Sequence, residues 1–308
     1  MKKASSDQDW WNGLDVFGKE WRVELAAGVG VKDTLDLTDA KLRALLASTS
    51  ITLYVYKGGV LDLEPLTRFP KLRELDITGF KKLENTKVLT KLSSLKKLTL
   101  RNDGLIDIGF LKNLVGLEQL DLMQNKLTGI TVLGSLVKLE TLDVGYNKLT
   151  TIDTLKKLTK LRTLSIAYNK IADLKALAEL KSLVELKAND NRYTDLTPLA
   201  KLTELASLDV SGPFAAGKIK TLEPLRDLIK LAFLDISCNP KLTDLAPLAG
   251  CASLETLNCT VISESIRGFQ DLLEIKALAK IVTHRDIMKK PDRDVFKKRR
   301  PRVELVIH

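Results

Sequence analysis

The chain has 308 residues, of which 44% are hydrophobic and only 5% aromatic, and its formal net charge is +10. This is enough apolar material for a sizeable core, and abundant leucine with few large rings favours a core of many small, equivalent layers. Half of the net charge comes from residues 281–308, which hold nine basic and four acidic side chains. The rest of the chain is only mildly basic, which argues against a protein that coats nucleic acid.

The N-terminal residues 1–49 carry no repeat and are expected to form a helical cap. Trp10, Trp11, Phe17 and Trp21 stand in one stretch, and Thr38 has the side chain of a helix N-cap before the helical pattern that follows it. Tryptophans grouped in this way are more typical of lid packing than of a ligand site. The stretch therefore predicts a lid over one end of the core.

A periodic pattern fills residues 50–275. The frame LxxLxLxxNxLxxIxxLxxLxx returns about ten times, usually after 22 residues, and all but the first of its units open with leucine. The alternating LxL segment indicates a short strand, and the later three-residue spacing indicates a 3₁₀ turn or short helix. Since one such coil cannot bury both its apolar sides, neighbouring coils are expected to stack with their strands parallel, about 4.8 Å apart.

Asparagine recurs where each unit turns away from its strand, and its amide can satisfy backbone groups inside the bend. This predicted structural ladder consists of Asn125, Asn147, Asn169, Asn191 and Asn239. Asp103 replaces asparagine in one unit, and Gly58, Phe80 and Pro213 mark units in which the ladder is interrupted. We expect those coils to be less regular.

This repeat resembles the leucine-rich-repeat family, in particular the 22-residue class seen in bacterial internalins and in a regulatory subunit of a eukaryotic protein phosphatase. The resemblance covers residues 50–275 and implies an α/β repeat fold. The implied fold is a curved solenoid with parallel strands on the concave face, 3₁₀ or short helical segments on the convex face, and a cap at each end. For function the resemblance implies protein recognition and leaves the partner open.

Residues 276–308 are expected to form a basic C-terminal cap of strand, helix and strand. Residues 277–283 and 303–307 have strand patterns, residues 292–300 have a helical one, and Pro301 separates the last two segments. The run KKRRPR within this unit has an alternative interpretation as a contact for anions or nucleic acid.

Two short motifs resemble catalytic signatures without completing them. GPFAAGK at residues 212–218 has the spacing of a phosphate-binding loop, but Ile219 replaces the magnesium-binding Ser or Thr and no long helix follows. His284 begins a kinase-like HRD triplet, but Pro291 stands in place of its metal-binding Asn. We therefore expect no enzyme and no cofactor; the alternative is an active site that uses His284 and the C-terminal unit.

Three cysteines, an odd number without CxxC spacing, indicate neither a disulfide framework nor a metal site. The first residues lack an apolar signal-peptide segment, and no run of about 18 apolar residues occurs anywhere. We expect a cytoplasmic protein without a membrane span. A secreted mature chain whose signal peptide had been removed would show the same pattern.

The residues between and just after the inward leucines are expected to line the concave face and to bind a partner. Tyr146 and Tyr168 are one repeat apart, so stacking places them side by side, and Asp121 and Asp143 form an acidic rung. Exposed aromatics beside charge are typical of binding hot spots; the alternative is that the tyrosines merely shield the bend. The full candidate set on this face is Tyr54, Tyr56, Arg101, Asp121, Met123, Asp143, Tyr146, Tyr168, Lys187, Asp209, Phe233 and Asp235.

A second candidate is the insertion in the 26-residue unit that starts at Leu205, whose extra residues include Phe214 and Lys218. Together these features predict a non-catalytic scaffold or regulator with a protein partner and without a nucleic-acid partner. The first alternative is a secreted or surface adhesion protein similar to internalins, and the second is anion or nucleic-acid contact through the basic C-terminal unit.

Overall fold

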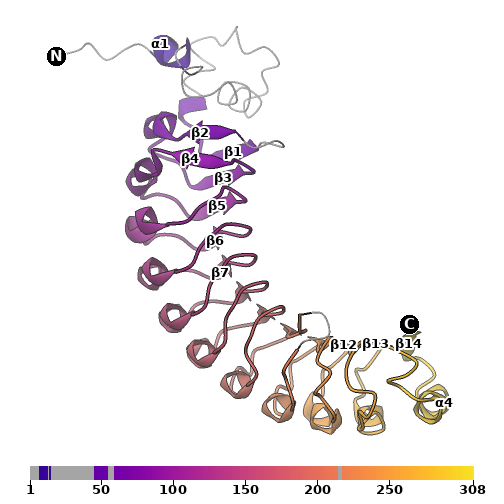
Figure 1. The fold of residues 1–308 in the computed structure, drawn as a ribbon. Helices are drawn as coiled ribbons and strands as arrows, with labels where there is room; N and C mark the ends of the chain where they lie inside the picture. Colours follow the sequence, from indigo (N-terminus) through magenta and orange to yellow (C-terminus); the bar gives the residue numbers. More distant parts are fainter. Residues whose placement is uncertain (1–6, 13, 15–44, 55–58, 214–216) are drawn as a thin grey trace. The chain divides into compact units, whose positions relative to one another are not determined.

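The leucine period builds the coils that the sequence predicts. In the computed structural model, which describes residues 7–12, 14, 45–54, 59–213 and 217–308, each coil runs from a short strand through a bend to a 3₁₀ turn and back (Figure 1). The chain divides into two units, Met1–Leu127 with Ser135–Asp143 and Thr128–Gly134 with Val144–His308. Both units are solenoids of parallel strands, which confirms the predicted fold class.

The first unit holds one parallel sheet and a smaller second one. The main sheet pairs its strands in the order β1, β3, β5, β6 and β7, and the smaller sheet pairs β2 with β4. Their bounds are β1 (Ser50–Tyr54), β2 (Val60–Asp62), β3 (Glu74–Thr78), β4 (Lys82–Glu84), β5 (Lys97–Arg101), β6 (Gln119–Asp121) and β7 (Thr141–Asp143). The smaller sheet is the departure from regularity that the interrupted ladder predicts, because β4 begins just after Phe80.

The second unit holds a parallel sheet in which each strand pairs with the next strand in sequence. Most of these strands are three residues long, with one inward leucine between two outward residues. They are β8 (Thr163–Ser165), β9 (Glu185–Lys187), β10 (Ser207–Asp209), β11 (Phe233–Asp235), β12 (Thr256–Asn258), β13 (Lys280–Thr283) and β14 (Glu304–Ile307).

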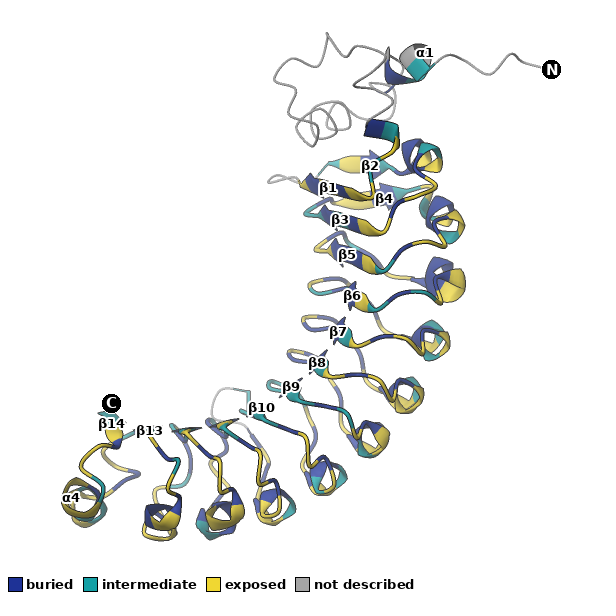
Figure 2. Ribbon diagram, turned by 180° about the vertical axis from the view of Figure 1, so that it is seen from behind, coloured by how far each residue is buried: buried dark blue, intermediate teal, exposed yellow. Residues whose placement is uncertain are grey.

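The return segments are 3₁₀ turns in almost every coil, as the three-residue spacing predicts. They are η2 (Glu64–Arg68), η3 (Thr86–Lys91), η4 (Gly109–Asn113), η5 (Thr131–Ser135), η6 (Asp153–Lys157), η7 (Lys175–Glu179), η8 (Thr197–Leu199), η9 (Glu223–Leu225), η10 (Ala246–Gly250) and η11 (Asp271–Glu274). Buried and exposed residues recur at the same places from coil to coil (Figure 2). Strand leucines such as Leu142, Leu164 and Leu186 are fully buried, and each contributes about 1.5–3 kcal/mol of burial free energy.

Asparagine side chains fill the bends. The Asn169 amide nitrogen donates to the carbonyl oxygens of Val144 and Ile166 at 3.0 and 3.1 Å, and its oxygen accepts from the Leu149 N–H at 2.9 Å. Asn125, Asn191 and Asn239 bond in the same way, and Asn147 donates to two carbonyls of its own bend. The amides of Asn125, Asn169, Asn191 and Asn239 therefore tie their own bends to the coil before each of them.

At the N-terminal end, the described part of residues 1–49 packs on the first coil. Helix α1 (Asp7–Asn12) places the Trp10 ring edge-on to Phe69, with centroids 6.0 Å apart, and Arg68 over the same ring at 5.5 Å. Trp11 is fully buried. The predictions for Phe17, Trp21, the N-cap at Thr38 and the start of its helix concern residues outside the described part of the chain.

At the C-terminal end, the strand, helix and strand form as predicted, but they continue the array. β13 pairs with β12, and β14 pairs in parallel with β13, so helix α4 (Lys290–Arg299) takes the place of a 3₁₀ turn in a further coil. Its Phe296 is buried. None of the helices in the described part of the chain is both long and apolar enough to cross a membrane.

Candidate protein-binding face

The outward residues of the strands, together with the bend residues that follow them, form the surface that we call the strand face, and it is described here unit by unit. In the second unit its most exposed aromatic feature is the pair Tyr146 and Tyr168. Their rings are stacked, with centroids 4.1 Å apart and an angle of 14° between the planes, and the side chains are 41% and 43% exposed. The fold thus presents two aromatic rings as one flat, half-exposed platform.

The backbone at both tyrosines is left-handed, with φ of 53° at each. This conformation costs an ordinary L-residue about 1–2 kcal/mol, and asparagine or glycine would adopt it with less strain. The bend asparagines impose it, because the tyrosines directly precede Asn147 and Asn169 in the ladder. Tyrosine therefore destabilises the bend relative to asparagine or glycine. This cost in free energy favours a functional role for the tyrosine side chains.

The hydroxyl ends of the stack are polar. Hydrogen bonding to the Tyr146 hydroxyl, together with partial burial and the nearby Asp190 carboxylate, raises the pKa of Tyr168 to about 12. Asp190 occupies the equivalent left-handed position of the next coil, with φ of 54°. The platform thus has an apolar surface with a neutral, hydrogen-bonded edge beside a carboxylate.

Aspartates continue this face along the second unit. Asp209 and Asp235 are in register on neighbouring strands, and each accepts hydrogen bonds from the serine two residues later, Ser211 or Ser237. Burial, and then the neighbouring Asp235 and Asp190, raise the pKa of Asp209. Phe233, on the same strand as Asp235, is 39% exposed.

Lys187 stands in register beside Asp209, but its ammonium group pairs with Glu185 at 3.1 Å. Among the described residues of this unit, no ion pair joins Asp190, Asp209 or Asp235 to a basic side chain. This part of the strand face is therefore acidic, although the chain as a whole is basic.

The first unit has a similar acidic column that the chain itself neutralises. Asp121 and Asp143 are in register, as the sequence predicts, but Arg101 forms an ion pair with Asp121. The hydrogen bond to Asp121, followed by the charges of Asp121, Asp143 and Asp76, raises the pKa of Arg101. The repeat pattern predicts Arg101, Asp121 and Asp143 as separate candidates, but it does not predict that the arginine lies among the aspartates.

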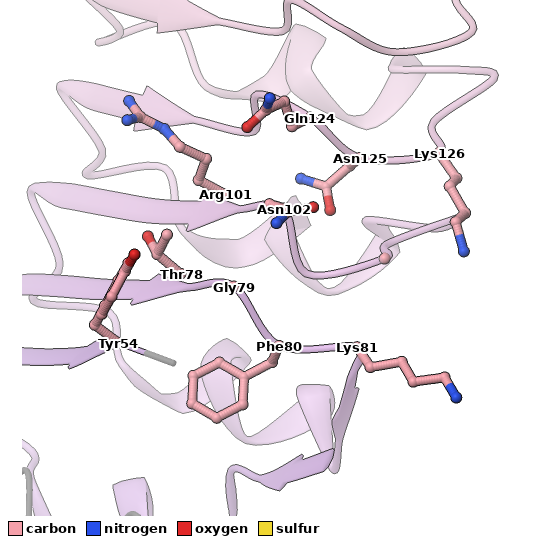
Figure 3. Close-up of a pocket in the computed structure, with 11 residues that line it drawn as sticks. Tyr54, Thr78, Gly79, Phe80, Lys81, Arg101, Asn102, Gln124, Asn125 and Lys126 are labelled. Atoms are coloured by element: carbon pink, nitrogen blue, oxygen red, sulfur yellow. The ribbon is translucent and has the colours of Figure 1, made fainter. Parts of the chain in front are cut away.

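A pocket of about 640 Å³ opens among the first bends of this unit (Figure 3). Tyr54 and Arg101 lie on one side of it, and the side chains of Lys81 and Lys126 lie on the other. Its remaining lining is Thr78, Gly79, Phe80, Asn102, Gly104, Gln124 and Asn125. Of these residues the sequence marked only Tyr54 and Arg101 as binding candidates; the interrupted ladder at Phe80 and Asp103 was the available signal.

The remaining predicted residues lie apart from these clusters. Met123 is half-buried, and its N–H donates to Asp121. In the insertion, Lys218 is exposed, but Gly217 already donates its N–H to the Cys238 carbonyl oxygen at 3.0 Å. Gly212 likewise donates its N–H to the Ser237 carbonyl oxygen at 2.9 Å. Tyr56 and Phe214 lie outside the described residues.

Gly217, near the end of the phosphate-loop-like motif, packs directly against backbone, because a Cβ atom on it would lie 2.3 Å from the Cys238 carbonyl oxygen. The next helical segment, η9, is only three residues long. Within the described part of the chain, no group of three His, Cys, Asp or Glu side chains could hold a metal ion.

In the C-terminal basic run, Arg299 and Arg300 are held by contacts within the chain. Arg300 donates to the carbonyl oxygens of Leu273 and Ile275 at 2.7 Å each, and also to those of Lys276 and Leu278. Arg299 pairs with Glu274 at 3.1 Å. These contacts favour a structural role over the anion-binding alternative.

Comparison with known proteins agrees with this geometry. The family model for leucine-rich repeats in two copies matches residues 115–157, 137–179 and 159–201. No curated protein sequence matches the chain. Among solved structures, internalin C2 of Listeria monocytogenes is 24% identical with a TM-score of 0.64, and the match covers 73% of this chain and 96% of that one.

Two further solved structures widen the range of organisms. A leucine-rich-repeat protein of Leptospira interrogans is 22% identical with a TM-score of 0.70, covering 86% of this chain and 74% of that one. The ectodomain of the plant membrane receptor kinase GASSHO1/SCHENGEN3 from Arabidopsis thaliana, in complex with CASPARIAN STRIP INTEGRITY FACTOR 2, is 20% identical with a TM-score of 0.59. That match covers 82% of this chain and 32% of the receptor. At these identities the likeness concerns the fold.

Proposed function

We propose that this chain is a non-catalytic leucine-rich-repeat scaffold or regulator that binds a protein partner on its strand face. The observation that carries the proposal is the Tyr146–Tyr168 stack, an exposed aromatic platform built at backbone positions where tyrosine is unfavourable. Rigid aromatic area that loses little entropy on binding is typical of interface hot spots. The plant receptor ectodomain with its bound factor illustrates such use of the fold in another protein.

The test replaces both tyrosines with asparagine, which suits the left-handed backbone. We expect the double variant Tyr146→Asn/Tyr168→Asn to lose capture of the partner from a lysate of the source cells, measured by affinity purification and mass spectrometry. Its stability should change by no more than about 1 kcal/mol, because relief of backbone strain offsets the lost ring stacking.

Ile229→Asn, which removes a 57% exposed apolar side chain near a loop, is the matched control and should retain capture. Unchanged capture by the tyrosine variant would refute the proposed interface. A loss of more than about 2 kcal/mol of stability would show instead that the rings shield the bend.

We further propose that the two ends of the array are caps, residues 1–49 and 276–308, and that the protein acts in the cytoplasm. The contacts of Trp10 and the buried Phe296 support the caps. Detection of the full-length protein on the cell surface or in the medium by fractionation would instead support the internalin-like adhesion role.

A further inference from the structure

The second unit carries three carboxylates on its strand face that no basic side chain of the described chain neutralises. Asp209 and Asp235 stand in register on neighbouring strands, a spacing of about 4.8 Å, and Asp190 lies at the bend of the coil before Asp209. All three are partly accessible. Like charges held this close repel each other, and a cation placed over them would relieve the repulsion.

In the first unit, a comparable column of aspartates has a cationic side chain of the same chain beside it. There, Arg101 pairs with Asp121 and lies near Asp76 and Asp143, which stabilise its charged form. The second unit has no counterpart to Arg101 among its described residues, because Lys187 turns to Glu185 and Lys280 turns to Glu304.

The aromatic platform lies at one end of these carboxylates. Asp190 is close enough to Tyr168 to contribute to its raised pKa, so the acidic group and the rings form one continuous surface. A guanidinium group suits this surface in both respects, because it stacks flat on aromatic rings and donates up to five hydrogen bonds to carboxylates. A lysine ammonium would satisfy the charges but would stack less well.

We propose that the protein partner of the second unit presents arginine side chains, of which one stacks on the Tyr146–Tyr168 platform and pairs with Asp190, and another pairs with Asp209 and Asp235. This inference rests on the proposed function, since it specifies the chemistry of the partner that the strand face binds. It also accounts for a basic protein that keeps unpaired carboxylates together on one face.

The experiment selects binders from a displayed library of random peptides on the immobilised full chain. We expect the enriched peptides to contain arginine, and synthetic copies in which citrulline replaces arginine should bind at least about tenfold more weakly, because the charge is lost at nearly constant shape. Affinity of the arginine peptides should also fall as sodium chloride is raised, as expected for partly exposed ion pairs.

Two double variants distinguish binding of arginine by these aspartates from a general effect of net charge. Asp190→Asn/Asp209→Asn keeps the side-chain oxygens that accept hydrogen bonds from Ser211 and Asn189, and it should weaken the selected peptides at least about tenfold. Asp153→Asn/Asp227→Asn makes the same change in net charge at exposed positions away from the strand face and should leave binding unchanged. Thermal denaturation checks that both variants are folded.

The outcomes are distinguishable. If the selected peptides require both tyrosines but contain no arginine, or bind equally well to Asp190→Asn/Asp209→Asn, the arginine inference is wrong and the proposed function stands. If binding is insensitive to Tyr146→Asn/Tyr168→Asn, the proposed function is wrong. Failure to enrich any peptide on the wild-type chain would count against both.

Discussion

Asp103 occupies the position that asparagine holds in the later coils, and its carboxyl group does not make all the hydrogen bonds that the asparagine amide makes there. The side chain is 1% exposed, and its Oδ1 accepts the Phe80 N–H at 2.9 Å, but its Oδ2 has no partner. The later asparagines use the corresponding amide nitrogen to donate to backbone carbonyls. Burial raises the pKa of Asp103 to about 8, so it is mostly protonated at neutral pH.

We predict that Asp103→Asn stabilises the protein by about 1–3 kcal/mol near pH 7.5, since a buried group without a partner gains hydrogen bonds. In the wild type, the folded state keeps a proton between about pH 4 and pH 8 that the unfolded state has lost. Stability from this group is therefore full below about pH 4 and falls as pH rises toward 8, by at most about 1.4 kcal/mol per unit.

Urea denaturation of both proteins at several pH values measures this effect. The variant should lack this component of the pH dependence, so the stability difference between the two proteins should grow from pH 4 to pH 8. A difference that is constant over this range would contradict the assignment of a protonated Asp103. Asp107→Asn, at an exposed position nearby in the sequence, is the control.

At the scale of the element, the C-terminal coil is stabilised by one side chain in particular. Arg300, just after α4, donates to four carbonyl oxygens at and after the end of η11, whereas the neighbouring Arg299 makes an exposed ion pair. Hydrogen bonds from a charged donor to partly buried carbonyls contribute more than surface ion pairs do. Helix and preceding coil are thus joined through the arginine.

We predict that Arg300→Ala destabilises the protein by about 2–3 kcal/mol, and that Arg299→Ala, with the same change in charge, costs at most about 1 kcal/mol. Thermal and chemical denaturation give both values. Hydrogen exchange should show faster exchange in β14 of the Arg300 variant. Equal effects of the two substitutions would show that charge alone matters in this basic run.

For the whole molecule, contacts in a repeat array run between neighbouring coils, so changes in coils that are not neighbours should act independently. We predict that the free-energy changes of Asp103→Asn and Arg300→Ala, which belong to different units, add to within about 0.5 kcal/mol in the double variant. Calorimetry of the single and double variants measures this. A deviation of more than about 1 kcal/mol would reveal coupling along the array.

Much of the array could be predicted from the sequence because periodicity decides it coil by coil. The inward leucines, the parallel strands, the 3₁₀ turns and the closeness of Tyr146 and Tyr168 all follow from stacking equivalent units. The small β2–β4 sheet, the pocket near Tyr54 and the neutralisation of Asp121 by Arg101 did not follow. They depend on irregular coils and on side-chain directions, which a repeat frame does not specify.

The left-handed residue before each bend has a consequence for engineering. Among the described residues, seven non-glycine residues occupy it, namely Asn102, Gln124, Tyr146, Tyr168, Asp190, Cys238 and Val261. Their chemical variety shows that the bend keeps its backbone conformation with different side chains, at a cost of about 1–2 kcal/mol for most of them. Randomising these positions should yield a library of binders on an unaltered framework. A variant with asparagine or glycine at each of these positions serves as the control without binding side chains.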